Sequence, residues 1–165
     1  DLFAQLIGKL KQDVDCEIVL FGGPEDHQTV AQIQALCGTD VTNLCGKTAL
    51  QDLPAAVSAC DLFITNDSGP MHIAVACGVP LVAIFCATTP SLGFYPYTSK
   101  AVVVQKDLHC RPCSSHGGRR CPLGTEDCIK LIRPEEVLQA AIQMLQVKDR
   151  MPPDSSTHAP QYLNL

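Results

Sequence analysis

The sequence predicts an α/β fold in which a doubly wound parallel sheet is covered by helices on both faces. Short, continuously apolar segments alternate along the chain with longer segments in which apolar residues recur at helical spacing. Gly and Pro separate these segments and mark the turns. Strands that are apolar throughout are buried on both faces, which is typical of a parallel sheet between two layers of helices. Hydrophobic residues make up 46% of the 165 residues, enough for a substantial core.

The predicted elements follow one another as repeated helix–strand units. Helices are expected over residues 2–10, 28–37, 50–60 and 70–77, and a last helix begins at Pro134. Strands are expected over residues 17–21, 41–44, 61–65, 81–85 and 101–105. In this architecture ligands bind at the carboxyl ends of the strands. The loops in which a site is expected are therefore residues 22–26, 46–48, 66–72 and 86–90.

A single domain is expected over residues 1–148, followed by a flexible end over residues 149–165, which are polar and rich in Pro. The chain begins with Asp1 and without a signal-peptide pattern, so we expect part of a longer protein. An apolar run over residues 73–87 is interrupted by Gly and Pro and is shorter than the ~20 residues of a membrane-spanning helix. It predicts a buried helix, a turn and a buried strand.

The charge pattern argues against nucleic acid as a partner. Asp and Glu number 17 and Lys and Arg 12, so the net charge is −5 and no basic excess is present to neutralise phosphates. Aromatic residues make up 5% and Trp is absent, which disfavours a stacking platform for bases.

The strongest local signal is the segment TNDSGPMH at residues 65–72, which ends a predicted strand and begins a predicted helix. The N–H groups of a helix's first turn, together with the positive end of its dipole, bind anions. Gly69 lets an oxygen ligand approach the main chain, and His72 can donate to a phosphate. Asp67 fits a partner of sugar hydroxyls or, like Ser68, a helix cap. An ordinary capped helix start explains the same residues, and both interpretations stay open.

Three further loops offer weaker candidates at the same sheet edge. Gly23 permits close approach to the main chain, and Glu25 can accept two hydroxyls of a ribose. Lys47, next to Thr48, can reach a phosphate, and Thr88 offers a hydroxyl. None of these loops has the spacing of a dinucleotide fingerprint or a P-loop. Plain turns and a solvated lysine are the alternatives.

Together these motifs resemble glycosyltransferase family nine, the ADP-heptose:lipopolysaccharide heptosyltransferase family. The resemblance is carried, in this order, by FGGPED, NLCGKTALQDLPAAVSACDLFITNDSGPMHIAVACGVPLVAIF, TTP and FYPY. It covers about residues 17–145, and the string D-S-G-P-x-H is its most specific part. The chain departs from the family at Cys86, where members often have Gly, and it resembles the carboxyl-terminal half alone.

The resemblance implies a GT-B fold, in which two Rossmann-like domains face a cleft. This chain would be the half that holds the nucleotide-sugar donor. The residues that would hold the diphosphate and the adjacent sugar are Asp67, Ser68, Gly69 and His72. Glu25 would meet the ribose, with Asp26 as the alternative one residue away, and residues 44–48 would hold the base.

The family's reaction is an inverting transfer, here of heptose from ADP-heptose to a lipid-linked saccharide. The resemblance implies that the base lies in the amino-terminal domain, which becomes a partner, so no catalytic residue is expected in this chain. It also implies that transfer requires no cofactor. The protein is expected in the cytoplasm, peripherally on the inner face of the inner membrane.

Four of the ten cysteines gather between residues 109 and 128. They are Cys110, Cys113, Cys121 and Cys128, at the spacing C-x2-C-x7-C-x6-C. Four thiolates suffice for a structural zinc ion or an iron–sulfur cluster, although this spacing fits no standard pattern. Free thiols or disulfides are the alternative.

Two other functions remain open at this point. A different glycosyltransferase or an epimerase of the same fold would use another nucleotide sugar, and a preference for uridine over adenosine would indicate it. A non-catalytic module stapled by metal at the cysteines would contain metal and bind no nucleotide.

Overall fold

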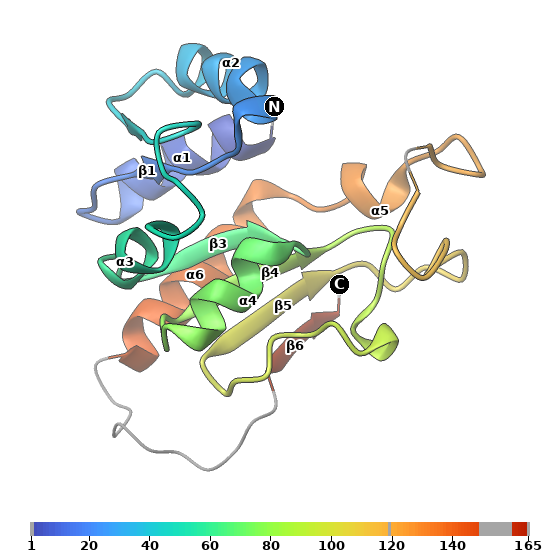
Figure 1. The fold of residues 1–165 in the computed structure, drawn as a ribbon. Helices are drawn as coiled ribbons and strands as arrows, with labels where there is room; N and C mark the ends of the chain where they lie inside the picture. Colours follow the sequence, from blue (N-terminus) through green and yellow to red (C-terminus); the bar gives the residue numbers. More distant parts are fainter. Residues whose placement is uncertain (1, 119, 149–159, 165) are drawn as a thin grey trace. The chain divides into compact units, whose positions relative to one another are not determined.

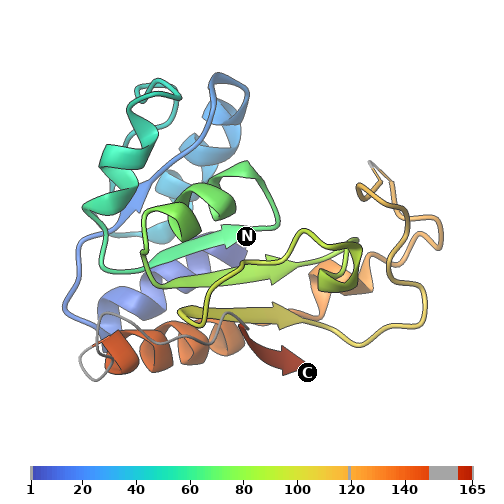
Figure 2. The same ribbon diagram turned by 60° about the horizontal axis from the view of Figure 1, so that its bottom comes forward.

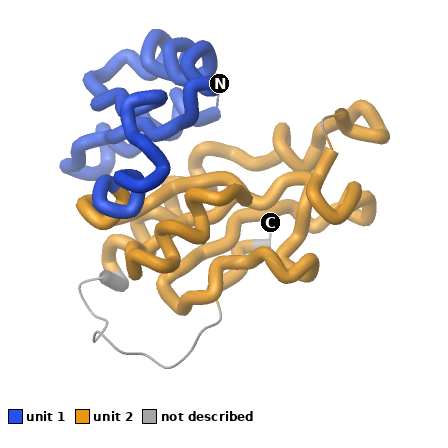
Figure 3. Tube along the Cα trace, in the orientation of Figure 1, with its two compact units in different colours: residues 1–56 blue, residues 57–165 orange. Residues whose placement is uncertain are grey.

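The computed structural model, shown in Figure 1, describes residues 2–118, 120–148 and 160–164. The chain forms two compact units, unit 1 (Asp1–Ala56) and unit 2 (Val57–Leu165), which are coloured blue and orange in Figure 3. The sequence predicted one domain over residues 1–148. The division falls within α3 (Leu53–Ser58), a helix that begins in unit 1 and ends in unit 2.

Unit 1 is built around a pair of short parallel strands. Its other elements in chain order are α1 (Leu2–Asp13), β1 (Val19–Leu20), the 3₁₀ turn η1 (Pro24–Asp26), α2 (His27–Cys37) and β2 (Thr42–Asn43). Strand β1 pairs with β2 in the register Val19–Thr42. The core consists of the apolar faces of the two long helices and partly buried residues around them, namely Ala4, Ile7, Ile33 and Cys37 with Phe3, Ile18, Leu20 and Val41.

Unit 2 contains a four-stranded parallel sheet in the order β3-β4-β5-β6. Its elements are β3 (Phe63–Asn66), α4 (Gly69–Ala76), β4 (Leu81–Phe85), η2 (Pro90–Leu92), β5 (Ala101–Gln105), α5 (Asp127–Lys130), α6 (Pro134–Lys148) and β6 (Gln161–Asn164). Every residue of β4 is buried, as expected of an apolar strand with neighbours on both edges and helices on both faces.

Two helices cover opposite faces of this sheet (Figure 2). Helix α4 packs on β3 and β4, and α6 packs on β4 and β5. Met71 and Ala74 of α4 and Ala141 and Met144 of α6 are almost fully buried. Within unit 2 the predicted doubly wound α/β arrangement is therefore confirmed.

The carboxyl ends of β3, β4 and β5 lie at one edge of the sheet, because the strands are parallel and in register. The pairs Asn66–Ile84 and Phe85–Gln105 mark that edge. The cysteine-rich segment, residues 109–128, follows β5 and extends from the same edge (Figure 2).

Three details differ from the sequence prediction. Strands β1 and β2 have two residues each, shorter than expected. Helix α5 begins inside the cysteine-rich segment, where no helix was predicted. Residues 161–164, predicted to belong to a flexible end, form β6, because the main chain of β5 offers hydrogen-bonding groups to a parallel neighbour. Residues 149–159 of that predicted end lie outside the described residues.

The apolar run over residues 73–87 forms the elements expected of it. Helix α4 ends at Ala76, a turn follows, and β4 begins at Leu81. Within the described residues, no helix combines the length and the apolar composition that crossing a membrane requires.

Candidate functional site

The loop between β3 and α4 places the strongest predicted residues at the carboxyl end of β3. The ladder of the sheet continues one residue past the strand, because the N–H of Asp67 donates to the carbonyl oxygen of Ile84 at 3.0 Å. Ser68 is then extended, with φ −161°, and Gly69 begins α4. His72 lies on the first turn of the helix and is exposed. Asp67, Ser68, Gly69 and His72 therefore form one compact turn.

Thr88 joins this turn from the loop after β4. Its Oγ1 donates to Oδ2 of Asp67 at 2.5 Å. The two residues are 21 positions apart in the sequence and meet because β3 and β4 are adjacent parallel strands. The structure thus brings together two side chains that the sequence predicted from separate loops.

The side-chain cap that the sequence allowed for α4 is not formed. Ser68 occupies the N-cap position, but its Oγ donates to the carbonyl oxygen of Asn66 at 3.2 Å and makes no cap bond. The carboxylate of Asp67 accepts from Thr88 instead. Neither side chain therefore bonds the N–H groups of the first turn, and a binding role for these residues stays a prediction.

In unit 1 the loops after β1 and β2 contact each other through the main chain. The N–H of Gly46 donates to the carbonyl oxygen of Gly22 at 2.9 Å, and the thiol of Cys45 donates to that of Gly23 at 3.1 Å. Gly46 has φ +67°, and a side chain there would collide with the ring of His27. The predicted segments 22–26 and 46–48 are thus neighbours in one unit.

The structure distinguishes the two carboxylates that the sequence left as alternatives. Asp26 accepts a hydrogen bond from the N–H of Gly23 at 2.9 Å and so caps η1. Glu25 is exposed, and its carboxylate lies directly over Gly23, where a Cβ would come within 2.5 Å of Oε1. The hydrogen bond that closes the turn is therefore made by Asp26, and the carboxylate of Glu25 stays exposed.

The remaining predicted residues of unit 1 have simple surroundings. Lys47 is exposed, and its Nζ donates to the carbonyl oxygen of Asn43 at 3.0 Å. Thr48 is half-buried. A role for either residue toward a nucleotide stays a prediction.

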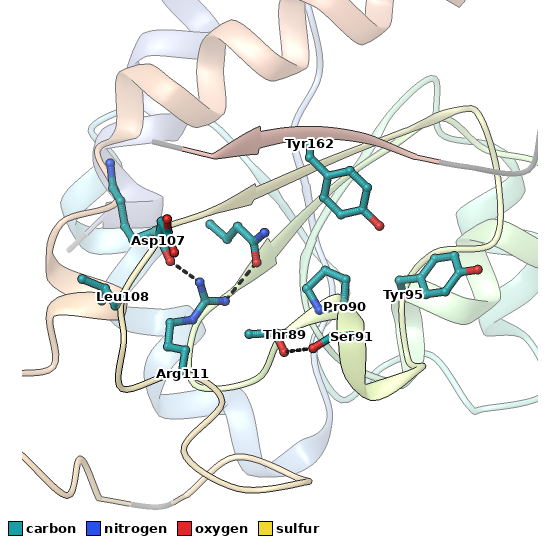
Figure 4. A pocket seen from close by; sticks show the side chains of 10 residues that line it. Thr89, Pro90, Ser91, Tyr95, Asp107, Leu108, Arg111 and Tyr162 are labelled. Atoms are coloured by element: carbon teal, nitrogen blue, oxygen red, sulfur yellow. Dashed lines mark hydrogen bonds between the residues drawn. The ribbon is translucent and has the colours of Figure 1, made fainter.

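Unit 2 also has a pocket of about 610 Å³ at the carboxyl ends of its strands (Figure 4). Its lining residues are Thr89, Pro90, Ser91, Tyr95, Gln105, Lys106, Asp107, Leu108, Arg111 and Tyr162. The loop after the fifth predicted strand, which was not among the loops expected to hold a site, supplies Lys106, Asp107 and Arg111. The same rule about carboxyl ends of parallel strands would have included them.

Both cations of this pocket are engaged within the protein. Lys106 is buried and pairs with Glu136 at 2.9 Å. Burial acts to raise the pKa of Glu136, but the N–H of Arg133 and the ammonium of Lys106 together lower this pKa below its ordinary value. Arg111 donates hydrogen bonds to main-chain and side-chain oxygens at the ends of β4 and β5.

The hypothesis of a metal site at the four clustered cysteines is not supported. All ten cysteines are free thiols, and among the described residues no three His, Cys, Asp or Glu side chains are placed to bind a metal ion. The Sγ of Cys113 donates to the carbonyl oxygen of Cys110, and that of Cys121 accepts from the N–H of Glu126. This N–H lowers the pKa of Cys121, whereas burial raises the pKa of Cys128 and sets that of Cys86 at about 11.

Comparison with known proteins points to one family. The family model for glycosyltransferase family 9 (heptosyltransferase) matches residues 1–122. Lipooligosaccharide heptosyltransferase 2 of Campylobacter jejuni is 36% identical over 87% of this chain and 45% of its own length. Lipopolysaccharide heptosyltransferase 2 of Escherichia coli K12 is 36% identical over 56% of this chain and 28% of its own length.

Solved structures agree with this result. The E. coli ADP-heptose lps heptosyltransferase II aligns with a TM-score of 0.74 at 29% identity, over 90% of this chain and 41% of that chain. The glycosyltransferase of family 9 from Veillonella parvula aligns with a TM-score of 0.70 at 30% identity, over 88% of this chain and 40% of that chain. The chain thus spans less than half the length of these relatives. Its fold is that of a Rossmann-like half of a GT-B glycosyltransferase, and the chain belongs to glycosyltransferase family 9.

Proposed function

We propose that this chain is the donor-binding half of an inverting heptosyltransferase of lipopolysaccharide core biosynthesis, which transfers heptose from ADP-heptose to a lipid-linked saccharide. The observation that carries the proposal is the turn at the end of β3. There an oriented carboxylate, Asp67, lies beside the uncapped start of α4 and an exposed imidazole, His72. The names of the relatives support heptose and lipopolysaccharide as the chemistry.

The roles of the residues follow from their chemistry. The N–H groups at the start of α4, approached over Gly69, and the imidazole of His72 bind the diphosphate. Asp67 accepts from hydroxyls of the donor sugar, beside Ser68 and Thr88. In unit 1, Glu25 over Gly23 accepts from the ribose, and the loop with Lys47 and Thr48 holds the base.

The part of this chain in transfer is stabilisation of the leaving group. As the bond between the anomeric carbon and the diphosphate breaks, negative charge grows on the diphosphate. Fixed N–H dipoles and a donating imidazole stabilise that charge without reorganising. Under this proposal transfer requires no cofactor.

The other components belong to the rest of the enzyme. The base that deprotonates the acceptor hydroxyl and the saccharide acceptor site are assigned to the amino-terminal domain. In this proposal the enzyme meets its lipid-linked acceptor in the cytoplasm, at the inner face of the inner membrane. Contact with that membrane is peripheral in this proposal.

Calorimetric titration with ADP and with UDP tests the donor assignment. The wild-type chain is expected to bind ADP more tightly than UDP, and His72→Ala is expected to weaken ADP binding by about tenfold, the effect of one charge-assisted hydrogen bond. Asp13→Ala, an exposed carboxylate on α1, is the control and leaves binding unchanged. Tighter binding of UDP would favour another nucleotide-sugar enzyme, and binding of neither nucleotide would contradict the proposal.

A further inference from the structure

The cysteine-rich segment has no part in the function proposed above, yet one of its side chains lies at the carboxyl edge of the sheet. Arg111 points its guanidinium toward the ends of β4 and β5 (Figure 4). The guanidinium donates to the carbonyl oxygens of four residues and to one side-chain oxygen. The carbonyls are those of Phe85, Cys86, Thr88 and Lys106, and the side-chain acceptor is Oε1 of Gln105.

Three of these five acceptors lie at the last residue of β4 and on the loop that follows it. Nη2 donates to the carbonyl oxygen of Phe85 at 3.1 Å and to that of Thr88 at 2.6 Å, while Nε donates to Cys86. The main chain adds a further tie, since the N–H of Cys113 donates to the carbonyl oxygen of Ala87 at 2.9 Å. Residues 85–88 are therefore held, residue by residue, by the cysteine-rich segment.

The hydrogen bonds continue from Arg111 through Thr88 to Asp67. Thr88 accepts from Arg111 at its carbonyl oxygen and donates from its hydroxyl to Oδ2 of Asp67 at 2.5 Å. A bond on Oδ2 orients the plane of the carboxylate, and with it the direction in which Oδ1 accepts a hydroxyl. The conformation of residue 88 thus determines how Asp67 faces a ligand.

We propose that Arg111 is a positioning residue for the donor sugar, because its guanidinium sets the conformation of Thr88 and thereby the orientation of the Asp67 carboxylate. This proposal rests on the proposed function, in which Asp67 binds hydroxyls of the sugar. It gives the cysteine-rich segment a role, which is to hold residues 85–88 in the conformation that orients Asp67.

The five hydrogen bonds at residue 111 require the planar guanidinium of arginine. Its five N–H groups lie in one plane with fixed directions and reach several acceptors at once. A lysine ammonium is a compact charge with three donors, so it retains the charge but cannot bond the same five oxygens. Arg111→Lys therefore removes the bracing while changing the volume and charge of the site little.

The test compares two ligands on the same protein. Calorimetry gives the dissociation constants of ADP and of ADP-heptose. The ratio of the ADP constant to the ADP-heptose constant measures how much the sugar contributes to binding. Arg111→Lys is expected to lower this ratio by about tenfold, because an oriented hydrogen bond to the Asp67 carboxylate is lost, while ADP affinity changes little. Arg133→Lys, a matched arginine whose side chain is 70% exposed, is expected to leave the ratio unchanged.

Two further variants separate positioning from stability. Thr88→Val keeps the carbonyl that Arg111 bonds but removes the hydroxyl that Asp67 needs, so it lowers the ratio as Arg111→Lys does. In an Asp67→Ala background, Arg111→Lys is expected to lower the ratio no further, because the group that it positions is gone. General destabilisation would weaken ADP and ADP-heptose alike and would persist in that background. If Arg111→Lys fails to fold, as judged by circular dichroism, Thr88→Val and its combination with Asp67→Ala carry the test.

The failures of the two proposals are distinguishable. A wild-type chain that binds ADP-heptose more tightly than ADP through Asp67, but keeps its ratio in Arg111→Lys and in Thr88→Val, overturns the positioning role alone. A wild-type chain that binds neither ligand overturns both the proposed function and the inference.

Discussion

The two units hold their candidate loops by different means. In unit 1 a main-chain hydrogen bond from Gly46 to Gly22 joins the loops after β1 and β2, and the side chains that bond Gly23, those of Asp26 and Cys45, belong to the same two loops. In unit 2 the loop after β3 is oriented by side chains from distant parts of the chain, Thr88 and, behind it, Arg111. The loops of unit 1 are therefore held by residues of their own, whereas the loop after β3 depends on side chains from distant parts of the chain.

The largest effect is expected where unit 2 depends on a buried charge pair. Lys106 and Glu136 are 2.9 Å apart, and their side chains are 11% and 6% exposed. Glu136→Ala leaves a buried ammonium without its partner, so the free energy of unfolding is expected to fall by about 3–5 kcal/mol. Urea denaturation followed by circular dichroism measures this loss. A loss below about 1 kcal/mol, the value of an exposed pair, would show that side chains do not hold unit 2 in this way.

A smaller effect is expected from main-chain conformation in unit 1. Gly46→Ala places a Cβ against the ring of His27 at a residue with φ +67°, and strain of this kind costs about 1–3 kcal/mol. Gly38→Ala is the matched control, because Gly38 has φ +65° and nothing within 4 Å of the added Cβ. The difference between the two thermal midpoints therefore isolates the collision with His27. Equal midpoints would contradict the close packing of the loops in unit 1.

The stability of unit 2 is expected to depend on pH through the buried pair of Lys106 and Glu136. The folded pKa of Glu136 is lowered from 4.5, so its contribution to stability is present above this value and is lost as the pH falls through the lower, folded pKa. Acid should destabilise unit 2 below about pH 4.5. Glu136→Gln removes that part of the pH dependence, which a series of denaturation curves from pH 7 to pH 3 measures. If the variant loses stability at low pH as the wild type does, the loss comes from other carboxylates.

The smallest effect is expected at an exposed pair of the same unit. Glu126, the N-cap residue of α5, and Lys130, the last residue of this helix, are 3.3 Å apart, with side chains 50% and 61% exposed. Glu126→Gln is expected to change the free energy of unfolding by less than about 0.5 kcal/mol, because solvent screens this pair. Urea denaturation under the same conditions as for Glu136→Ala tests it. A loss similar to that of Glu136→Ala would remove the distinction between buried and exposed pairs.

The sequence predicted much of the fold because apolar periodicity is a local property. Strand residues 81–85 and 101–105 agree with β4 and β5 as the structure has them, and the helix that begins at Pro134 agrees with α6. The strands of unit 1 came out shorter and β6 was missed, because pairing with a neighbouring strand decides where a ladder begins and ends. Periodicity carries no information about that partner.

The candidate site divides in the same way. The strand–turn–helix geometry around Asp67 and the glycine turns of unit 1 are local, so residue types alone predicted them. The bond from Thr88 to Asp67 and the bond from Gly23 to Asp26 depend on contacts that the spacing of residues does not specify.

The sequence by itself determined the α/β class, the order of the elements and the loops in which ligand-binding residues gather, because these follow from apolar patterning and turn residues along the chain. The tertiary structure alone decided which of those residues meet. It placed Arg111 of the cysteine-rich segment beside Thr88 and paired Lys106 with Glu136 across 30 positions. The physical reason is that carbonyl oxygens and buried charges must find partners in space, and the nearest partner in space is seldom near in sequence.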